Sequence, residues 1–471
     1  MKKQAFNPYL PSWEYIPDGE PYVFDGRVYV YGSHDQFNGW VFCQGDYMGY
    51  SAPVDDLGNW RCEGVIYEKT QDPLNSDGRM CLYAPDVTKG PDGRYYLYYV
   101  LDKVSVVSVA VCDTPAGKYR FLGYVHYKDG TRLGERPGDE PQFDPGVITE
   151  GDKTYLYTGF CGYRDASRHG AMCTVLESDM LTIAEEPVFV APGMCYADGT
   201  DFEGHAFFEA SSIRKRGETY YFVYSSTPMH ELCYATGSSP KGPFHYGGVI
   251  VSNADIHIDT YKPADMPAAA GGNNHGSIVE INGQWYIFYH RQTNGHWYSR
   301  QVCAEPIEFR ADGSIIQAEI TSCGLNGGPL KGEGYYPAYI ACNLFSREPQ
   351  RIVGKPGEPC ITQDGRDGDP VEGHITRIAG GTTIGFKYFD CHAVKGIRIW
   401  YRGYCGGVFE VRTAWDGETL GEIPVQNVNV WTESSCEVAI PDGVQAIYFV
   451  YRGHGSPDGA GPDLKGFSFI C

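Results

Sequence analysis

Alternating apolar and polar residues recur along the first two thirds of the chain as short strand pairs joined by tight turns. Residues 16–35 read IPDGEPYVFDGRVYVYGSHD, in which Asp25-Gly26 is a turn signal and the following VYVY alternates like the second strand of a hairpin. The same pattern returns four times, around Gly93, Gly151, Gly217 and Gly283. Hardly any segment has a sustained helical period, so the pattern predicts an all-β chain.

The hairpins recur at a nearly constant spacing. Their turn glycines lie 67, 58, 66 and 66 residues apart. Strand repeats at such a period are typical of propeller blades, because one blade cannot bury its apolar faces alone and must stack on its neighbours around an axis. Five repeats therefore predict a five-bladed β-propeller over residues 1–325.

One ionisable residue occupies the same position in every repeat, seven or eight residues before the turn glycine. If the first strand of each hairpin is innermost, the shared position brings these side chains to one end of the axis. Polar strand ends are common and chance is the alternative, but converging charges are costly to bury and seldom kept for packing alone. The five residues are Asp18, Asp86, Asp144, Glu209 and His275.

Composition narrows the classes of ligand. The net charge of -21 disfavours nucleic acid and anionic membranes as partners, because both need a basic footprint, and a neutral or weakly charged ligand fits better. The N-terminal MKKQAFNPYLPSWEY lacks an apolar run and no later segment is long enough to span a bilayer, which predicts a cytoplasmic protein. The sixteen cysteines have no framework spacing and no CxxC pair, so we expect reduced thiols and no zinc site of that kind.

The remaining residues have the pattern of a second domain. Residues 326–350, which include most of the segment GLNGGPLKGEGYYP (residues 324–337), are predicted to be a linker packed on the propeller. Short alternating strands separated by turns such as Asp416-Gly417 and Asp442-Gly443 then fill residues 351–471. This pattern predicts a β-sandwich of the jelly-roll kind.

The ordered motifs of residues 5–320 resemble glycoside hydrolase family 43, whose members are five-bladed propellers. The matching segments are NPYLPSWEYIPDGEP, YAPD, FDPGV, FFEASS, NNHGS and FYHR. The resemblance implies that Asp18 is the general base, Asp144 the carboxylate that tunes the pKa and orients the substrate, and Glu209 the general acid. The chain departs from the family at Asp18-Gly19, where Asp-Pro is usual.

The acid and base roles also follow from elementary chemistry. Cleavage of a glycosidic bond needs one group that protonates the leaving oxygen and another that activates water on the opposite face of the sugar. Phe207 and Phe208 flank Glu209, and Asp144 is expected beside it, so burial and a like charge should raise the pKa of Glu209 and keep it protonated. Asp18 must stay ionised. A separation of about 6.5–9.5 Å between the two carboxyl groups would lead to inversion.

Further residues receive less specific roles. Arg291, in FYHR, is expected to contact a sugar hydroxyl or a central carboxylate, or else to form a structural ion pair. Asp86 is expected to be structural or to face the substrate. By the resemblance, His275 lies on the axis and touches a hydrated ion, often calcium, while a direct metal ligand is the weaker reading. No cofactor is expected to be required for the chemistry, and the resemblance leaves room for a structural calcium on the axis or in the sandwich.

The sandwich sequence resembles family 6 carbohydrate-binding modules through IGFKYFD, IRIWYRG and AIYFVYRG. Trp431 and Tyr388 either stack on sugar or belong to the core, and we expect the sandwich mainly to brace the propeller or close its pocket.

Together these features predict an inverting, exo-acting glycosidase that removes a terminal sugar from plant-derived oligosaccharides. The resemblance favours pentose as that sugar, cleaved by an α-L-arabinofuranosidase or a β-D-xylosidase. The alternatives are a β-D-galactofuranosidase or galactan-cleaving enzyme and, of another class, a sugar-binding propeller without catalysis.

Overall fold

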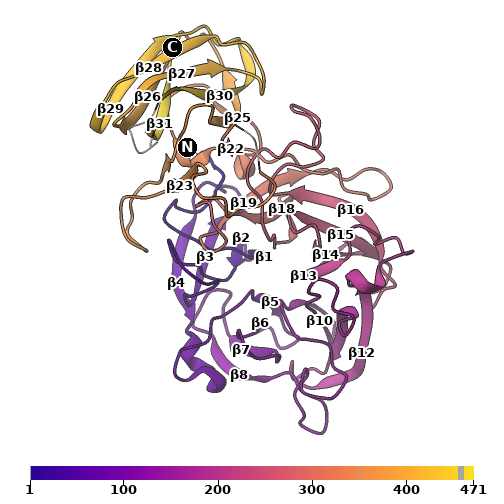
Figure 1. Cartoon of the computed structure of the whole chain (residues 1–471). Coiled ribbons are helices and arrows are strands. Elements are labelled where there is room, and N and C mark those ends of the chain that lie inside the picture. The colour runs from indigo at the N-terminus through magenta and orange to yellow at the C-terminus, as the bar shows by residue number, and fades with distance from the viewer. Residues whose placement is uncertain (1, 348–349, 455–460) are drawn as a thin grey trace.

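The computed structural model describes residues 2–347, 350–454 and 461–471 of the chain. Five small antiparallel sheets surround a common axis, and two larger sheets follow beside them (Figure 1). The described residues contain no α-helix. Their helical turns are five short 3₁₀ segments, η1 (Lys69–Gln71), η2 (Pro73–Asn75), η3 (Met194–Tyr196), η4 (Gly324–Asn326) and η5 (Ala338–Ile340). The all-β prediction of a five-bladed propeller followed by a sandwich is confirmed.

Each blade is one sheet whose strands follow chain order from the axis outward. Four blades have four strands and the fifth has three. Their bounds are β1 (Glu20–Phe24), β2 (Arg27–Tyr31), β3 (Tyr47–Pro53) and β4 (Arg61–Tyr67); β5 (Asp86–Lys89), β6 (Tyr95–Tyr99), β7 (Ser108–Cys112) and β8 (Arg120–Tyr124); β9 (Gly146–Glu150), β10 (Lys153–Thr158), β11 (Gly170–Leu176) and β12 (Ile183–Pro192); β13 (Phe207–Arg216), β14 (Thr219–Ser226), β15 (Glu231–Gly237) and β16 (His245–Ser252); β17 (Ile278–Ile281), β18 (Gln284–Arg291) and β19 (Gln301–Ile307).

The turn glycines lie where the sequence predicts them, between the first two strands of each blade. In blade one, Asp25 (φ 48°) and Gly26 (φ 75°) join β1 to β2, and in blade five Asn282 (φ 51°) and Gly283 (φ 83°) join β17 to β18. Two successive left-handed residues match the twist of a two-residue hairpin. Blade two differs, because its connection spans residues 90–94.

The N-terminal segment closes the ring. The three-stranded fifth blade leaves β19 with a free edge, and the start of the chain lies against it. Asn7 donates its side-chain amide to the carbonyl of Ala304 (2.9 Å) and accepts from the Ala304 amide (3.0 Å), while the Tyr9 amide donates to the Val302 carbonyl (3.3 Å). The first and last blades are thereby joined, which leaves no open seam at this point of the ring.

The second domain consists of two six-stranded sheets packed around a core that includes Phe386, Phe449 and Phe467. The predicted linker 326–350 contributes three short strands to it, because β20, β21 and β22 each pair with a sandwich strand. The strands are β20 (Leu330–Lys331), β21 (Tyr335–Pro337), β22 (Asn343–Phe345), β23 (Cys360–Thr362), β24 (His374–Thr376), β25 (Thr383–Cys391), β26 (Gly396–Gly403), β27 (Gly406–Arg412), β28 (Gly421–Val425), β29 (Val428–Glu437), β30 (Gly443–His454) and β31 (Asp463–Ile470).

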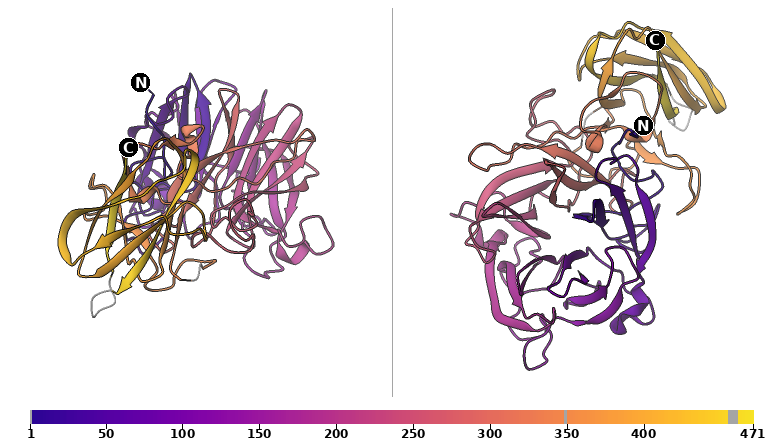
Figure 2. Two further views of the ribbon diagram at one scale, coloured as in Figure 1. Left: turned by 90° about the horizontal axis from the view of Figure 1, so that it is seen from above. Right: turned by 180° about the vertical axis from the view of Figure 1, so that it is seen from behind.

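The sandwich lies against the side of the propeller where the first and last blades meet, as the views in Figure 2 show. Polar groups tie the two together. Lys387 of β25 is fully buried, and its ammonium group lies 2.7 Å from Glu319 and 3.5 Å from Asp255. The Ile361 amide donates to the Thr293 carbonyl at 2.9 Å. The sandwich thus contacts the connection between β18 and β19.

Among the described residues, no helix is long and apolar enough to cross a membrane.

Candidate active site

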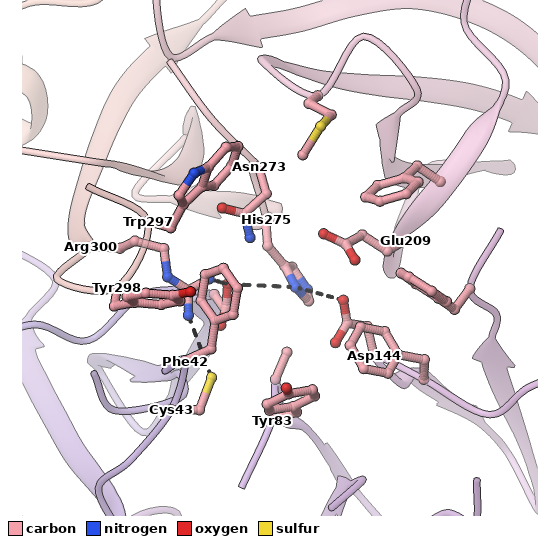
Figure 3. Close-up of a pocket in the computed structure, with 16 residues that line it drawn as sticks. Phe42, Cys43, Tyr83, Asp144, Glu209, Asn273, His275, Trp297, Tyr298 and Arg300 are labelled. Carbon is pink, nitrogen blue, oxygen red and sulfur yellow. Dashed lines mark hydrogen bonds and ion pairs between the residues drawn. The ribbon is translucent and has the colours of Figure 1, made fainter. Parts of the chain in front are cut away.

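A cavity of about 590 Å³ opens at one end of the propeller axis (Figure 3). Charged residues form its floor and aromatic side chains form much of its wall. The lining residues are Asp18, Phe42, Cys43, Tyr83, Ala84, Phe143, Asp144, Phe160, Phe208, Glu209, Met229, Asn273, His275, Trp297, Tyr298 and Arg300. Four of the five residues that share a position in the repeats therefore meet here. The fifth, Asp86, does not line the cavity.

The strand register explains the position of Asp86. Asp18 and Asp144 each lie two residues before the first pair of the inner ladder, which is Glu20 with Tyr31 in blade one. In blade two the connection between the first two strands is longer, so Asp86 itself belongs to the first residue pair of the inner ladder, opposite Tyr98. Ala84 consequently takes the place of a carboxylate in the cavity. Asp86 lies one level deeper, where its carboxylate accepts from the Tyr22 hydroxyl and the Val147 amide, both at 2.7 Å.

The backbone before the inner strands is strained at both carboxylates. Asp18 (φ 59°) and Asp144 (φ 41°) have left-handed conformations, which Asp tolerates better than most residues and which cluster at functional sites. Gly19 follows Asp18 where the resemblance leads one to expect proline. A Cβ at Gly19 would lie 3.0 Å from the Cγ1 of Val30, so the departure places the smallest residue at a close approach of two strands.

Asp18 is buried and surrounded by groups that favour its ionised form. Arg300 Nη1 donates to Asp18 Oδ1 at 2.9 Å, and Ser33 donates to Oδ2. His290 Nδ1 lies 3.2 Å from Oδ1. Burial works to raise the pKa of Asp18, but the Arg300 guanidinium and the His290 imidazole outweigh it and hold the pKa well below its usual range. Asp18 is therefore a carboxylate at neutral pH.

Glu209 has the opposite environment. It lies on β13 at an irregularity in the pairing with β14, and Phe160 and Phe208 line the cavity with it. Burial first, and then the nearby Asp144 carboxylate, raise the pKa of Glu209 to about 8. Glu209 is therefore protonated at neutral pH, as the sequence argument expects. One cavity thus holds a protonated and an ionised carboxyl group.

Asp144 and His275 connect these two groups. His275 Nδ1 lies 3.6 Å from Asp144 Oδ2 and 4.0 Å from Asp18 Oδ1, and the close-up shows the imidazole between the two sides of the cavity (Figure 3). Burial opposes the charged form of His275, but the carboxylates of Glu20, Asp144 and Asp18 raise its pKa to about 9. His275 is therefore a buried cation that offsets part of the negative charge.

The structure corrects the expectation that Arg291 contacts substrate. Neighbouring residues of β18 point to opposite faces, so His290 faces Asp18 and Arg291 faces away from the cavity. Arg291 is buried, and its guanidinium donates to the carbonyls of Ala341 (3.2 Å) and Cys342 (3.1 Å) at the base of the sandwich. It is a structural residue.

Arg300 is the cavity arginine that sequence reasoning missed. It directly precedes β19, and besides Asp18 it contacts Asp35 through its Nε (2.8 Å) and Nη2 (3.0 Å). Trp297 and Tyr298, three and two residues earlier, also line the cavity and were not foreseen. One feature of the sequence could have indicated these residues: they lie in the connection between β18 and β19, which is expected at the same end of the axis as the carboxylates.

The residues on the axis do not suit a divalent cation. His275 Nε2 and Glu20 Oε1 lie 3.6 Å apart, and neither has a hydrogen-bond partner among the described residues, which would fit a water molecule. Arg214 Nη2, however, donates to Glu20 Oε2 at 2.7 Å, and its guanidinium lies 4.2 Å above the ring of Tyr22. A calcium ion on Glu20 would face this buried positive charge directly. The described residues of the sandwich contain no cluster of three His, Cys, Asp or Glu ligands.

The chain is similar to known proteins over its whole length. The sequence profile of glycosyl hydrolases family 43 matches residues 23–315. A xylosidase/arabinosidase from Thermoclostridium stercorarium is 67% identical over 477 residues and covers 100% of both chains. A xylosidase/arabinosidase from Bacteroides ovatus is 31% identical over 349 residues, which are 66% of this chain and 97% of the relative.

A solved structure is similar over about two thirds of the chain. It is a family 43 β-xylosidase/α-arabinofuranosidase from a compost microbial metagenome, in complex with xylotriose and in a calcium-free form. Its sequence is 28% identical, its TM-score is 0.51, and the match covers 66% of this chain and 96% of that chain.

Proposed function

Because the chain belongs to glycosyl hydrolase family 43 and is a glycoside hydrolase, we propose that it removes terminal pentose residues from plant-derived oligosaccharides by an inverting, exo-acting mechanism. The pentose is an α-L-arabinofuranosyl or a β-D-xylopyranosyl unit, a choice that the names of the two xylosidase/arabinosidase relatives support. The observation that carries the mechanism is the presence, in one cavity, of protonated Glu209 and ionised Asp18.

Four ionisable residues of the cavity have defined tasks in this reaction. Glu209 donates its proton to the glycosidic oxygen as the bond to the anomeric carbon breaks. Asp18 removes a proton from a water molecule that attacks the opposite face of the sugar. Asp144 keeps the pKa of Glu209 high, and Arg300 keeps the pKa of Asp18 low. Because proton donor and acceptor are set by their surroundings before substrate binds, no reorganisation is needed at the moment of reaction.

The shape of the cavity supports exo action on short chains. Its volume of about 590 Å³ lies in the middle of the range of about 300–1,000 Å³ that is common for small-molecule sites. Trp297, Tyr298 and Phe42 form one side of it and offer apolar faces to a sugar ring (Figure 3). A site of this size accepts the end of an oligosaccharide better than the middle of a polymer.

In this proposal the positive charge on the axis is the guanidinium of Arg214. Arg214 neutralises Glu20 where a metal would otherwise do so, and the chemistry needs no metal ion because proton transfer is carried by Glu209 and Asp18. A water molecule between His275 and Glu20 would complete the hydrogen bonding of both.

The sandwich, in this proposal, is a structural brace for the cavity and forms a domain with the segment 326–350. It contacts the connection between β18 and β19, on which Trp297, Tyr298 and Arg300 lie, through the hydrogen bond from Ile361 to Thr293. Asp367 also accepts from the Phe37 amide at 2.6 Å, near the segment that carries Phe42. Both contacts hold loops that form one wall of the cavity.

The experiment that tests the function is the release of nitrophenol from aryl α-L-arabinofuranoside, β-D-xylopyranoside and β-D-galactofuranoside. Cleavage of one or both pentosides supports the proposal, with activity lost by orders of magnitude in Asp18→Asn on these aryl glycosides and in Glu209→Gln on a pentosyl oligosaccharide, whose leaving group needs a proton. Cleavage of the galactofuranoside alone would show that the substrate is a galactofuranoside and not a pentoside. A wild-type protein that binds sugars but cleaves none of the three would contradict the proposal and favour a sugar-binding propeller.

A further inference from the structure

A second cluster of chemically active side chains lies in blade four, outside the cavity. His205, Glu231 and Cys233 each offer one ligand atom, and these atoms all lie within 4.8 Å of one another. It is the one group of three such ligands in the part of the chain that the structure describes. None of the three residues lines the catalytic cavity, so the acid and base mechanism does not use them.

Glu231 is the centre of the cluster. Its Oε2 lies 2.9 Å from His205 Nδ1 and 3.5 Å from Cys233 Sγ, and its Oε1 lies 4.0 Å from His257 Nε2. Glu231 and Cys233 are buried, whereas the side chains of His205 and His257 are 30% and 52% exposed. The carboxylate oxygens and the sulfur atom therefore lie at the buried end of the cluster. The two imidazoles lie at its end nearest to solvent.

The surrounding structure fixes these side chains in place. Glu231 and Cys233 are two residues apart on β15 and so point to the same face of the sheet. Ser226 donates to Glu231 Oε2 at 2.7 Å. The His205 ring stacks on Tyr246 of β16, with centroids 4.8 Å apart and planes at 12°. Supporting contacts of this kind orient metal ligands and strengthen their sites.

The donor set selects a class of cation. Imidazole nitrogen, carboxylate oxygen and thiolate sulfur are the ligands of Zn²⁺, with bonds of about 2.0–2.3 Å, whereas Ca²⁺ and Mg²⁺ prefer sites made of oxygen alone. The ligand atoms of the three residues already lie within 4.8 Å of one another, close enough for one cation to contact all three. His257, on the connection between β16 and β17, is the nearest further ligand.

We propose that His205, Glu231 and Cys233 form a binding site for one Zn²⁺ or a related divalent transition-metal ion, with His257 as fourth ligand. On binding, the proton shared by His205 and Glu231 and the thiol proton of Cys233 pass to solvent, and four bonds to the cation replace them. The site joins three elements, namely the loop before β13, the strand β15 and the loop before β17. Met229, which lines the catalytic cavity, lies two residues before Glu231, so the cation anchors the wall of the cavity from behind.

The test is a titration of the reduced, chelator-treated protein with Co²⁺, whose bond to a thiolate gives a charge-transfer absorption in the near ultraviolet. We expect this band to saturate at one equivalent of Co²⁺ and to disappear on addition of Zn²⁺. Cys233→Ser should abolish the band, and His205→Gln should weaken binding by about 10–100-fold, the scale on which metal sites respond to altered ligand surroundings. His257→Gln should weaken binding less, because this side chain must move to reach the ion.

Two controls separate this site from other thiols and from misfolding. Cys195→Ser removes an exposed cysteine outside the cluster and should leave the band unchanged. His205 is partly exposed, so His205→Gln should keep the wild-type circular dichroism spectrum and thermal transition. The absence of stoichiometric Co²⁺ binding, or binding that persists unchanged in folded His205→Gln and Cys233→Ser, would overturn the proposal and leave His205 and Glu231 as a simple ion pair.

Discussion

Arg300 Nη1 lies 2.9 Å from Asp18 Oδ1, and both side chains are almost completely buried. The pair is more than a structural ion pair, because the guanidinium is also held by Asp35 and so has a fixed position against the proposed base. A buried carboxyl group without such a partner would take up a proton and lose its function as a base. In the proposed mechanism, the glycosidase activity therefore depends on an arginine that takes no part in proton transfer.

Replacement of Arg300 by lysine should impair the base without removing the charge. Lysine cannot contact Asp18 and Asp35 in the forked geometry of arginine, so the pKa of Asp18 should rise. We expect kcat/KM to fall by about 10²-fold or more and a new decline of activity on the acid side of the pH profile. Arg412→Lys, which changes a pair with Glu410 in the sandwich, is the matched control. An unchanged pH profile in Arg300→Lys would contradict this role.

The alkaline side of the pH profile should report Glu209. Its pKa is raised to about 8, and only the protonated form can donate, so kcat/KM should decline as the pH rises through that value. Asp144→Asn removes a neighbouring negative charge and should lower the pKa of Glu209, which moves the decline to lower pH. Asp201→Asn, at an exposed loop residue, should leave the profile in place. A decline that stays where it is in Asp144→Asn would assign it to another group.

Arg291 should matter for stability and not for substrate binding. Arg291→Met leaves two buried carbonyls, those of Ala341 and Cys342, without their donor. We expect a loss of about 1–3 kcal/mol in the free energy of unfolding, measured by denaturant titration, with KM unchanged. The exposed Arg310→Met serves as the control. A raised KM at unchanged stability would return Arg291 to the substrate site.

Calcium should have no effect on this enzyme. Because the guanidinium of Arg214 faces Glu20 on the axis, added Ca²⁺ should change neither the Tm nor kcat/KM, and chelation should not produce a loss that Ca²⁺ repairs. Activity that is lost on chelation and restored by Ca²⁺ but not by Zn²⁺ would show that the axis does bind calcium. Repair by Zn²⁺ alone would instead point to the cluster in blade four.

The sequence predicts those features that depend on local patterns. A turn glycine and the alternation of the flanking strands determine each hairpin, and for this reason the sequence predicts the five blades and the convergence of Asp18, Asp144, Glu209 and His275. Asp86 lies about as many residues before its turn glycine as the other members of the set, but its strand register differs. The five-residue connection of blade two moves the start of the ladder by two positions.

The parts of the cavity that were missed come from long connections. Arg300, Trp297 and Tyr298 follow β18 in a segment without alternation, and its path depends on contacts with Asp35 and the sandwich. Arg291 was misplaced for a related reason, because no local pattern tells which face of β18 looks into the cavity. Contacts between distant residues, such as Ile361 with Thr293, become visible only in the folded chain.

The central claim is the division of labour between Glu209 and Asp18, and the most direct test is the dependence of each variant on the leaving group. A pentoside with a dinitrophenyl leaving group needs no proton from the enzyme, whereas a pentosyl oligosaccharide does. Glu209→Gln should therefore lose about 10²–10⁴-fold more activity on the oligosaccharide than on the dinitrophenyl pentoside, and Asp18→Asn should lose activity on both alike. Equal losses on both substrates in Glu209→Gln, or full activity in Asp18→Asn, would contradict the account.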